Sequence, residues 1–280
     1  MLYKFLSFVL YAVFFNFYFL VYANSPLEKF SYCSKGACRI ITTNDFAYSR
    51  GMPRDLNFSC KKDNQYALTF DDGPSTNYPR LLEILAKHNI KATFFVIGAN
   101  LQNSDAEKYY AQMAAAGHFM ANHTLNHPDL TAMSAEDIYN QVEQSRQIFL
   151  NAPSLKNVSL SPELFSRLQV STKYVRPPYG NINNKVDQVF KQHGFVSVRW
   201  NGDRYDWEMP VNTESTKTIV QRVLQQLDFI QTQTEHGVVF NKSILDLNHD
   251  FQNSTIEALD LYIPLIKARG YEFVTMDECL

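Results

Sequence analysis

The chain has 280 residues, of which 45% are hydrophobic and 19% are charged, and its formal net charge is -2. This composition excludes a disordered or low-complexity protein and is typical of a globular domain with a sizeable core. The nearly neutral charge gives no electrostatic reason to expect nucleic-acid binding, because proteins that bind phosphate backbones usually carry a basic excess.

The first 23 residues differ from the rest of the chain. Lys4 precedes a nearly continuous apolar and aromatic run from Phe5 to Tyr22, and Ala23 is a small residue at which a signal peptidase could cut. We expect residues 1–23 to be a secretory signal peptide. An uncleaved membrane anchor is the alternative, because about 18 apolar residues can just span a bilayer. The protein is therefore expected to be secreted, at a cell surface or in a cell wall.

Four cysteines follow this segment. In an oxidising compartment an even number of cysteines indicates disulfides, and four cysteines allow three pairings. We favour Cys33 with Cys38 and Cys60 with Cys279, of which the second would connect the start of the domain to its end.

The remaining chain divides by pattern. Residues 24–63 are rich in turn and polar residues, which predicts an N-terminal extension on a main domain of residues 64–280. In the main domain we expect strands at 66–70, 91–97, 117–122 and 244–249, and helices at about 79–88, 105–116 and 135–149. This alternation indicates βαβ units and a parallel sheet, and about seven strands would suit a barrel or near-barrel. Two polar stretches that break the alternation, 151–172 and 231–242, are predicted to be surface loops.

Candidate metal ligands follow two of the predicted strands. Asp71 and Asp72 end the first strand, and His123 and His127 follow the third. Two histidines four residues apart share a face if they lie on a helical turn, and one carboxylate completes the three protein ligands of a catalytic zinc. The second carboxylate could be a general base. Each motif alone is more often a turn or a surface accident, whereas the two together favour a metal site.

Three further segments carry polar or aromatic residues. Arg176 and Tyr179 lie in the stiff run Arg-Pro-Pro-Tyr-Gly, where the arginine could hold a carboxylate and the Tyr179 backbone N–H could bind an oxyanion. Both tryptophans of the chain lie near carboxylates in the segment that ends at Trp207, which suits stacking on sugar rings. His249 ends an apolar strand and is a candidate general acid, because histidine titrates near neutral pH. A rigid turn or a core residue is the alternative in each case.

In this order, the five segments resemble the motifs of the polysaccharide deacetylase family with the NodB homology domain, carbohydrate esterase family 4. The motifs correspond to residues 69–74, 123–127, 176–180, 203–207 and 245–249. The resemblance extends over about residues 64–280, and the C-terminal run is most similar to eukaryotic chitin deacetylases. It implies a single-domain distorted (β/α) barrel and a divalent metal, with zinc expected first and cobalt as the alternative.

The resemblance also implies a role for each matched residue. The implied catalytic residues are Asp71, His249, Arg176, Asp206 and Tyr179. The implied metal ligands are Asp72, His123 and His127, and the implied substrate-binding residues are Tyr179, Trp207 and Leu247. Asp71 would be the base, oriented by Arg176. His249, tuned by Asp206, would protonate the leaving amine. Asp203 would support the loop or Arg176.

Several residues depart from the family pattern. Arg204 and Tyr205 are bulky where small residues are common, and Asp246 and Asn248 make the fifth motif more polar than usual. The two predicted loops are long and could reshape or block a groove at the mouth of the barrel.

The implied function is a secreted, metal-dependent hydrolase that removes N-acetyl groups from GlcNAc units of chitin or chitin oligomers, giving chitosan and acetate. Two alternatives stay open. One is a catalytically silent carbohydrate-binding or cell-wall protein on the same fold, and the other is a deacetylase of another polysaccharide, such as peptidoglycan or acetylated xylan. The expected partner is chitin or a related GlcNAc polysaccharide, and neither nucleic acid nor an obligate protein partner is inferred.

Overall fold

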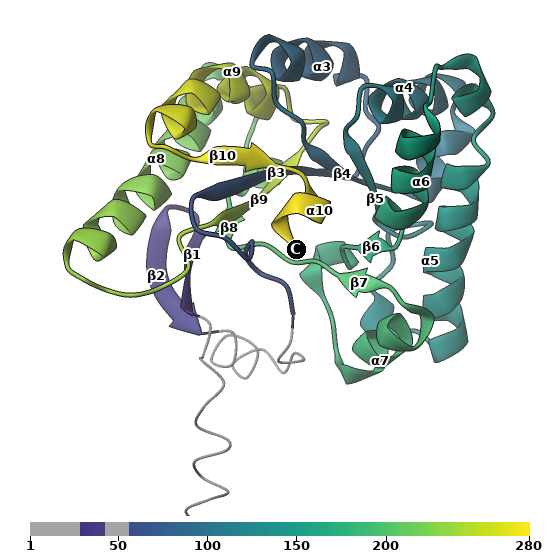
Figure 1. Cartoon of the computed structure of the whole chain (residues 1–280), viewed down its shortest axis with the longest axis horizontal. Coiled ribbons are helices and arrows are strands. Elements are labelled where there is room, and N and C mark those ends of the chain that lie inside the picture. The colour runs from purple at the N-terminus through teal and green to yellow at the C-terminus, as the bar shows by residue number, and fades with distance from the viewer. Residues whose placement is uncertain (1–28, 43–55) are drawn as a thin grey trace, which may run out of the picture.

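The computed structural model describes residues 29–42 and 56–280, so the predicted signal peptide lies outside the described residues. A ten-stranded sheet forms the centre of this part, with helices packed around it (Figure 1). The strands are β1 (Lys29–Ser34), β2 (Ala37–Thr42), β3 (Gln65–Asp71), β4 (Thr93–Val96), β5 (Phe119–Asn122), β6 (Tyr174–Val175), β7 (Val196–Ser197), β8 (Gly202–Asp203), β9 (Ile244–His249) and β10 (Glu272–Val274). The α-helices are α3 (Tyr78–Lys87), α4 (Ser104–Ala115), α5 (Ala135–Leu150), α6 (Pro162–Ser171), α7 (Asn184–His193), α8 (Thr213–Glu235), α9 (Asn253–Ala268) and α10 (Met276–Cys279).

Seven parallel strands form the barrel. The sheet runs β9-β3-β4-β5-β6-β7, and the chain from β7 to β8 closes the circuit because β7 pairs with β6 while β8 pairs with β9. The predicted distorted (β/α) barrel of about seven parallel strands is therefore confirmed. Strands β6, β7 and β8 have only two residues each, so few residue pairs form the sheet on this side of the barrel.

Strand β9 shows how the barrel separates its two faces. Leu245 packs with Phe95 and Phe119 in a cluster inside the barrel, whereas Ile244 packs with residues of the surrounding helices. Because side chains alternate along a strand, His249 shares the inner face with Leu245. Asp246 belongs to the face that looks toward the helices.

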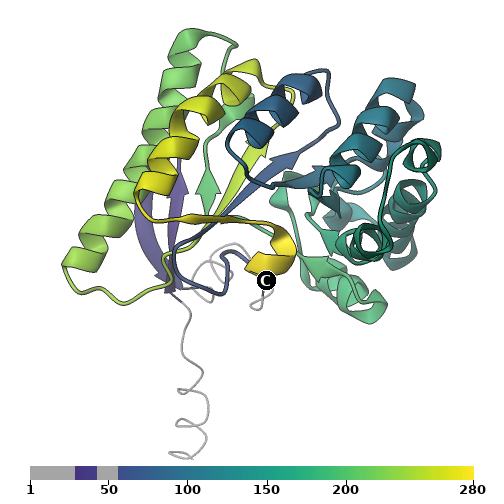
Figure 2. The same ribbon diagram turned by 45° about the horizontal axis from the view of Figure 1, so that its top comes forward.

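The described part of the N-terminal segment forms a hairpin. Strands β1 and β2 pair antiparallel, and β1 pairs in parallel with β8. Figure 2 shows the hairpin beside the long helix α8. Both favoured disulfides are confirmed: Cys33–Cys38 bridges the hairpin, and Cys60–Cys279 joins the start of the barrel to its end. The division into an extension of residues 24–63 and a domain of residues 64–280 stays a prediction.

The two predicted surface loops are partly wrong. Residues 151–172 contain α6, which begins with a proline and is capped by Ser161, whose hydroxyl accepts the Leu164 N–H at 3.3 Å. The segment 231–242 begins inside α8, because the apolar stripe that includes Leu227 and Ile230 keeps this polar helix packed on the core. None of the helices in the described ranges is long and apolar enough to cross a membrane.

Candidate active site

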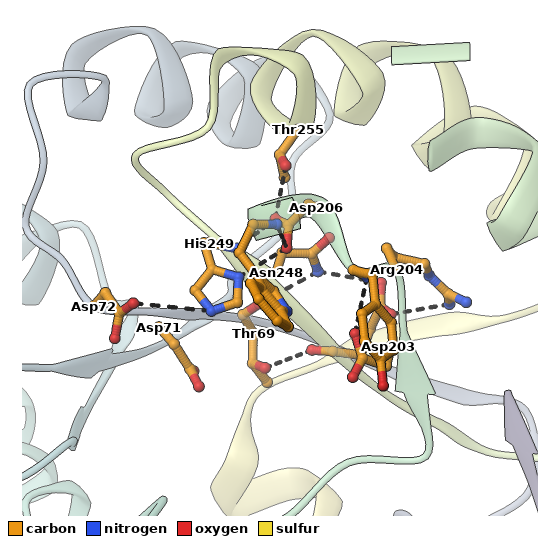
Figure 3. Close-up of polar contacts among 12 residues, drawn as sticks. Thr69, Asp71, Asp72, Asp203, Arg204, Asp206, Asn248, His249 and Thr255 are labelled. Carbon is orange, nitrogen blue, oxygen red and sulfur yellow. Dashed lines mark hydrogen bonds and ion pairs between the residues drawn. The ribbon is translucent and has the colours of Figure 1, made fainter. Parts of the chain in front are cut away.

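The ends of β3 and β9 bring two predicted residues together. Asp71, the last residue of β3, is paired in register with His249, the last residue of β9. Their exposed fractions are 3% and 9%, so both ionisable side chains lie largely away from solvent. In Figure 3 the His249 ring points toward Asp71 and Asp72. The candidate site thus lies at the carboxyl ends of the strands, where barrels of this type carry their chemistry.

Three potential metal ligands converge next to this pair. The ligand atoms of Asp72, His123 and His127 all lie within 4.8 Å of one another. Asp72 Oδ1 is 3.4 Å from His123 Nε2 and 3.3 Å from His127 Nε2. His123 Nδ1 lies 2.7 Å from the backbone oxygen of Arg176, which directs Nε2 toward the cluster. One carboxylate and two imidazoles in this arrangement fit a divalent metal such as zinc.

The two histidines do not lie on the helical turn that their spacing suggested. The segment is a loop in which Thr124 and His127 have left-handed φ angles of 70° and 56°. Asn122 Oδ1 accepts the Thr124 N–H at 2.8 Å, and Thr124 Oγ1 accepts the His127 N–H at 3.0 Å. These side-chain bonds offset the cost of the left-handed backbone, and the two imidazole centroids come within 4.8 Å.

The charges of the cluster suit cation binding. Burial raises the pKa of Asp72, but the neighbouring imidazoles, His123 first, outweigh burial and lower the pKa to about 2. Burial and the nearby His123 lower the pKa of His127. An ionised carboxylate and a neutral imidazole are the forms in which these side chains bind a metal.

Arg176 is fully buried and holds one oxygen of Asp71. Its Nη1 donates to Asp71 Oδ1 and to Thr69 Oγ1, both at 2.7 Å, and its Nη2 donates to the Arg199 backbone oxygen at 3.1 Å. Asp71 Oδ2 lies 3.8 Å from His123 Nε2, so the second oxygen faces the metal-ligand cluster. Thr69 was missed from sequence, although its position two residues before Asp71 on one strand puts both on the same face.

Asp206 makes two bonds to His249. The His249 backbone N–H donates to Asp206 Oδ2 at 2.7 Å, and the ring Nδ1 lies 2.8 Å from Asp206 Oδ1. Burial lowers the pKa of His249, but the charge and hydrogen bond of Asp206 outweigh burial and raise the pKa to about 9. Thr255 Oγ1 donates to Asp206 Oδ2 at 2.7 Å. Thr255 was also missed, and no motif marks this position in α9.

Aromatic and apolar side chains border the site. Tyr179 is 65% exposed and Trp207 is 48% exposed, and the Tyr179 ring lies 4.6 Å from the His127 ring. Leu247 is buried on the inner face of β9, two residues before His249. Exposed ring faces beside carboxylates suit the binding of sugars, whose C–H surfaces stack on aromatic rings.

Asp203 contacts its own loop. Its Oδ1 accepts the Tyr205 backbone N–H at 2.9 Å, and its Oδ2 accepts the Trp200 Nε1–H at 3.2 Å. Tyr205 has a left-handed φ of 51°, so this bond stabilises the bend that leads from β8 to Asp206. Of the two supports predicted for Asp203, these bonds serve the loop.

Comparisons with known proteins agree with this geometry. Residues 59–198 match the family model described as polysaccharide deacetylase. A peptidoglycan-N-acetylglucosamine deacetylase of Listeria monocytogenes is 31% identical over 220 residues, which cover 78% of this chain and 39% of that protein. The chain thus spans about two fifths of the length of this relative.

A second relative and a solved structure are matched over most of their length. A chitooligosaccharide deacetylase of Sinorhizobium fredii is 32% identical over 206 residues, covering 73% of this chain and 86% of that protein. The structure of the chitin deacetylase of the fungus Colletotrichum lindemuthianum matches with a TM-score of 0.63 and 28% identity, covering 80% of this chain and 90% of that one.

Proposed function

The chain belongs to the polysaccharide deacetylase family, and from this membership we propose that it hydrolyses the N-acetyl groups of GlcNAc units in chitin or chitin oligomers, giving chitosan and acetate. One observation carries the proposal: the potential ligand atoms of Asp72, His123 and His127 converge beside a carboxylate, Asp71, and an imidazole, His249. A metal site, a base and an acid are the groups that metal-dependent amide hydrolysis uses.

In this proposal Asp72, His123 and His127 hold a divalent metal, with zinc expected first and cobalt as the alternative. When bound, the metal would act as a Lewis acid and lower the pKa of water at the site. The low pKa of Asp72, about 2, keeps this ligand ionised across the physiological range.

The chain's own residues then supply the proton transfers. Asp71, held through one oxygen by Arg176, accepts the proton of the attacking water on the other oxygen. The backbone N–H of Tyr179 donates to the oxygen that becomes negative as the carbonyl is attacked. His249, kept protonated by Asp206, donates its Nε2 proton to the amide nitrogen as the C–N bond breaks. The products are acetate and a glucosamine unit.

Two features support the substrate class and the location. Exposed rings of Tyr179 and Trp207 border the site and would stack on sugar units, and Leu247 would line the acetyl pocket. The disulfides, together with the similarity to a fungal chitin deacetylase, support an extracellular protein, because disulfides persist in oxidising compartments. The signal peptide at residues 1–23 is part of this proposal.

The test is acetate release from chitin tetramer and pentamer by the zinc-loaded protein, with an Asp71→Asn variant as control. We expect release by the wild type, and a loss on the order of 10²–10⁴-fold in the variant. Dialysis against a chelator should abolish release, and added zinc should restore it.

The outcomes separate the alternatives. Acetate from peptidoglycan or acetylated xylan, but not from chitin, would keep the chemistry and change the substrate. A protein that binds one zinc ion and chitin oligomers but releases no acetate from any polymer would be a carbohydrate-binding protein. A protein that binds no metal would contradict the proposed ligands.

A further inference from the structure

A buried cluster of polar side chains lies on the face of the sheet that looks toward α8, opposite the face of β9 that carries His249. We call it the outer polar cluster, and its members are Tyr66, Arg204, Gln226, Asp246 and Asn248. All five have an exposed fraction of 0%. Figure 3 shows Arg204 and Asn248 of this cluster beside the His249–Asp206 pair. The cluster contains the charged residues that depart from the family pattern.

An ion pair forms the centre of the cluster. Arg204 Nη2 lies 2.9 Å from Asp246 Oδ1 and donates to Gln226 Oε1 at 2.8 Å. The other carboxylate oxygen, Asp246 Oδ2, accepts the Tyr66 hydroxyl and the Asn248 Nδ2–H, the latter at 3.2 Å. Asp246 thus faces a cation through one oxygen and two hydrogen-bond donors through the other.

Burying such a pair between a sheet and a helix has a large desolvation penalty. Taking two charges out of water costs several kcal/mol per ion, and well-packed apolar residues are often as stable or more stable in their place. Ile219, Val223 and Leu227 of the same helix supply ordinary apolar packing against the sheet. Stability alone therefore does not require the pair, and a buried ion pair can instead specify one defined arrangement of strands.

The pair joins the two strands that carry the proposed acid and its partner. Strand β8 leads to Asp206, and β9 ends at His249. These strands pair over two positions only, Gly202 with Asp246 and Asp203 with Leu247. A shift of one residue would turn every side chain of the strand to the opposite face. Asn201, just before β8, adds two bonds to β9, because its N–H donates to the Leu245 oxygen at 3.1 Å and its Oδ1 accepts the Leu245 N–H at 2.7 Å. The buried ion pair adds a contact between side chains of the two strands that requires the same register.

The ion pair also packs against the backbone of β8 and is flanked by α8. A Cβ atom at Gly202 would lie 2.9 Å from Asp246 Oδ1 and 3.0 Å from Arg204 Nη2, so the ion pair lies directly over the β8 backbone. Arg222 of α8 donates to the Arg204 backbone oxygen, and Arg204 Nη1 donates to the Arg222 backbone oxygen at 3.4 Å. Arg204, at the start of the loop that leads to Asp206, therefore contacts both β9 and α8.

We propose that Arg204 and Asp246 are positioning residues, whose ion pair fixes the register of β8 on β9 and so aligns Asp206 with His249. This inference rests on the proposed function, because the aligned pair is the proposed acid. Neither residue contacts the metal-ligand cluster. They act through the backbone of the two strands.

The test compares three full-length, zinc-loaded proteins: wild type, Arg204→Met/Asp246→Leu, and a control, Arg167→Met/Asp277→Leu. The control removes another ion pair, with Arg167 Nε 2.7 Å from Asp277 Oδ2, that joins α6 to α10. We measure kcat and KM for acetate release from chitin pentamer. A second readout is the proton NMR resonance of the His249 Nδ1–H that faces Asp206. This resonance can be assigned because it should be absent from the spectrum of His249→Ala.

We expect kcat of the Arg204→Met/Asp246→Leu variant to fall on the order of tenfold to a hundredfold, with KM little changed, because misplacement of a reacting group lowers kcat steeply. The Nδ1–H resonance should broaden or disappear. The control variant should keep the wild-type kcat and the His249 Nδ1–H resonance. Two single variants extend the test: Arg204→Lys should retain a higher kcat than Arg204→Met, since lysine keeps a charge opposite Asp246.

Wild-type kcat and an unchanged resonance in the Arg204→Met/Asp246→Leu variant would overturn the inference. If the wild type releases no acetate, the proposed function fails, and the resonance alone then decides the positioning role. If the double variant does not fold, Asp246→Asn decides by the same two measurements, because it keeps the size of the side chain and removes its charge.

Discussion

Two buried arginines show how the same pair of residue types serves two regions of this barrel. Arg176 and Arg204 both have no exposed surface, and each lies within 3 Å of an aspartate, at 2.7 Å from Asp71 and 2.9 Å from Asp246. Arg176 leaves one oxygen of Asp71 facing the metal-ligand cluster. In the outer polar cluster, Asp246 Oδ1 faces Arg204, and Asp246 Oδ2 accepts hydrogen bonds from Tyr66 and Asn248.

The pKa directions reflect this difference. Burial lowers the pKa of Arg176, and the charge of Asp71 does not fully oppose it. Burial acts in the same direction on Arg204, but Asp246 and Tyr66 outweigh it and raise its pKa. Burial therefore outweighs the neighbouring carboxylate at Arg176, whereas the neighbouring groups outweigh burial at Arg204. At the aspartate of the outer pair burial still prevails, because it raises the pKa of Asp246 against the charge of Arg204.

The largest expected effect is that of Arg176→Met. It leaves Asp71 buried without its cation, so the free energy of unfolding should fall by about 3–5 kcal/mol. Because the proposed base also loses its orientation, kcat should fall on the order of 10²–10⁴-fold. Urea unfolding and acetate release measure the two quantities. Arg204→Met is the matched control, with a similar loss of stability and a smaller loss of kcat. Equal losses of kcat would contradict the distinction between the two pairs.

A second experiment concerns the acid beside the inner pair. The protonated His249 is the proposed proton donor, and its protonated fraction falls as pH rises through its pKa of about 9. Asp206→Asn removes the charge that opposes burial, so the pKa should fall and the alkaline limb of kcat should move to lower pH. Initial rates between about pH 6 and pH 10 measure this limb. Thr255→Val, which leaves the Asp206 charge in place, should keep the limb near its wild-type position. An unmoved limb in Asp206→Asn would exclude His249 as the titrating acid.

The smallest expected effect is that of Tyr66→Phe in the outer polar cluster. Loss of the hydroxyl removes one donor to Asp246 while the ion pair with Arg204 remains, so the free energy of unfolding should fall by about 1–3 kcal/mol with kcat close to wild type. The control is Tyr110→Phe, because Tyr110 is equally buried and its hydroxyl has no hydrogen-bond partner among the described residues. Equal destabilisation of both variants in urea would show that the bond to Asp246 contributes nothing.

Much of the fold could be predicted because its signals are local. Alternating apolar strands and amphipathic helices indicated the parallel barrel, and an even number of cysteines pointed to disulfides. The two loop predictions were partly wrong because a polar composition does not exclude a helix. Helix α6 begins at a proline and a serine cap inside a Ser-rich stretch, and α8 continues through Gln- and Thr-rich sequence on one buried stripe.

The candidate residues were predicted from motif order, and their assigned roles stay predictions. The sequence by itself determined which carboxylates and imidazoles follow which strands, because strand ends can be recognised from local pattern. Only the tertiary structure decided that His123 and His127 converge through a left-handed loop, and that Thr69 and Thr255 hold the proposed base and acid pairs. It also decided that Arg204 meets Asp246. These contacts join residues far apart in the chain, and their energies depend on burial, which no local pattern specifies.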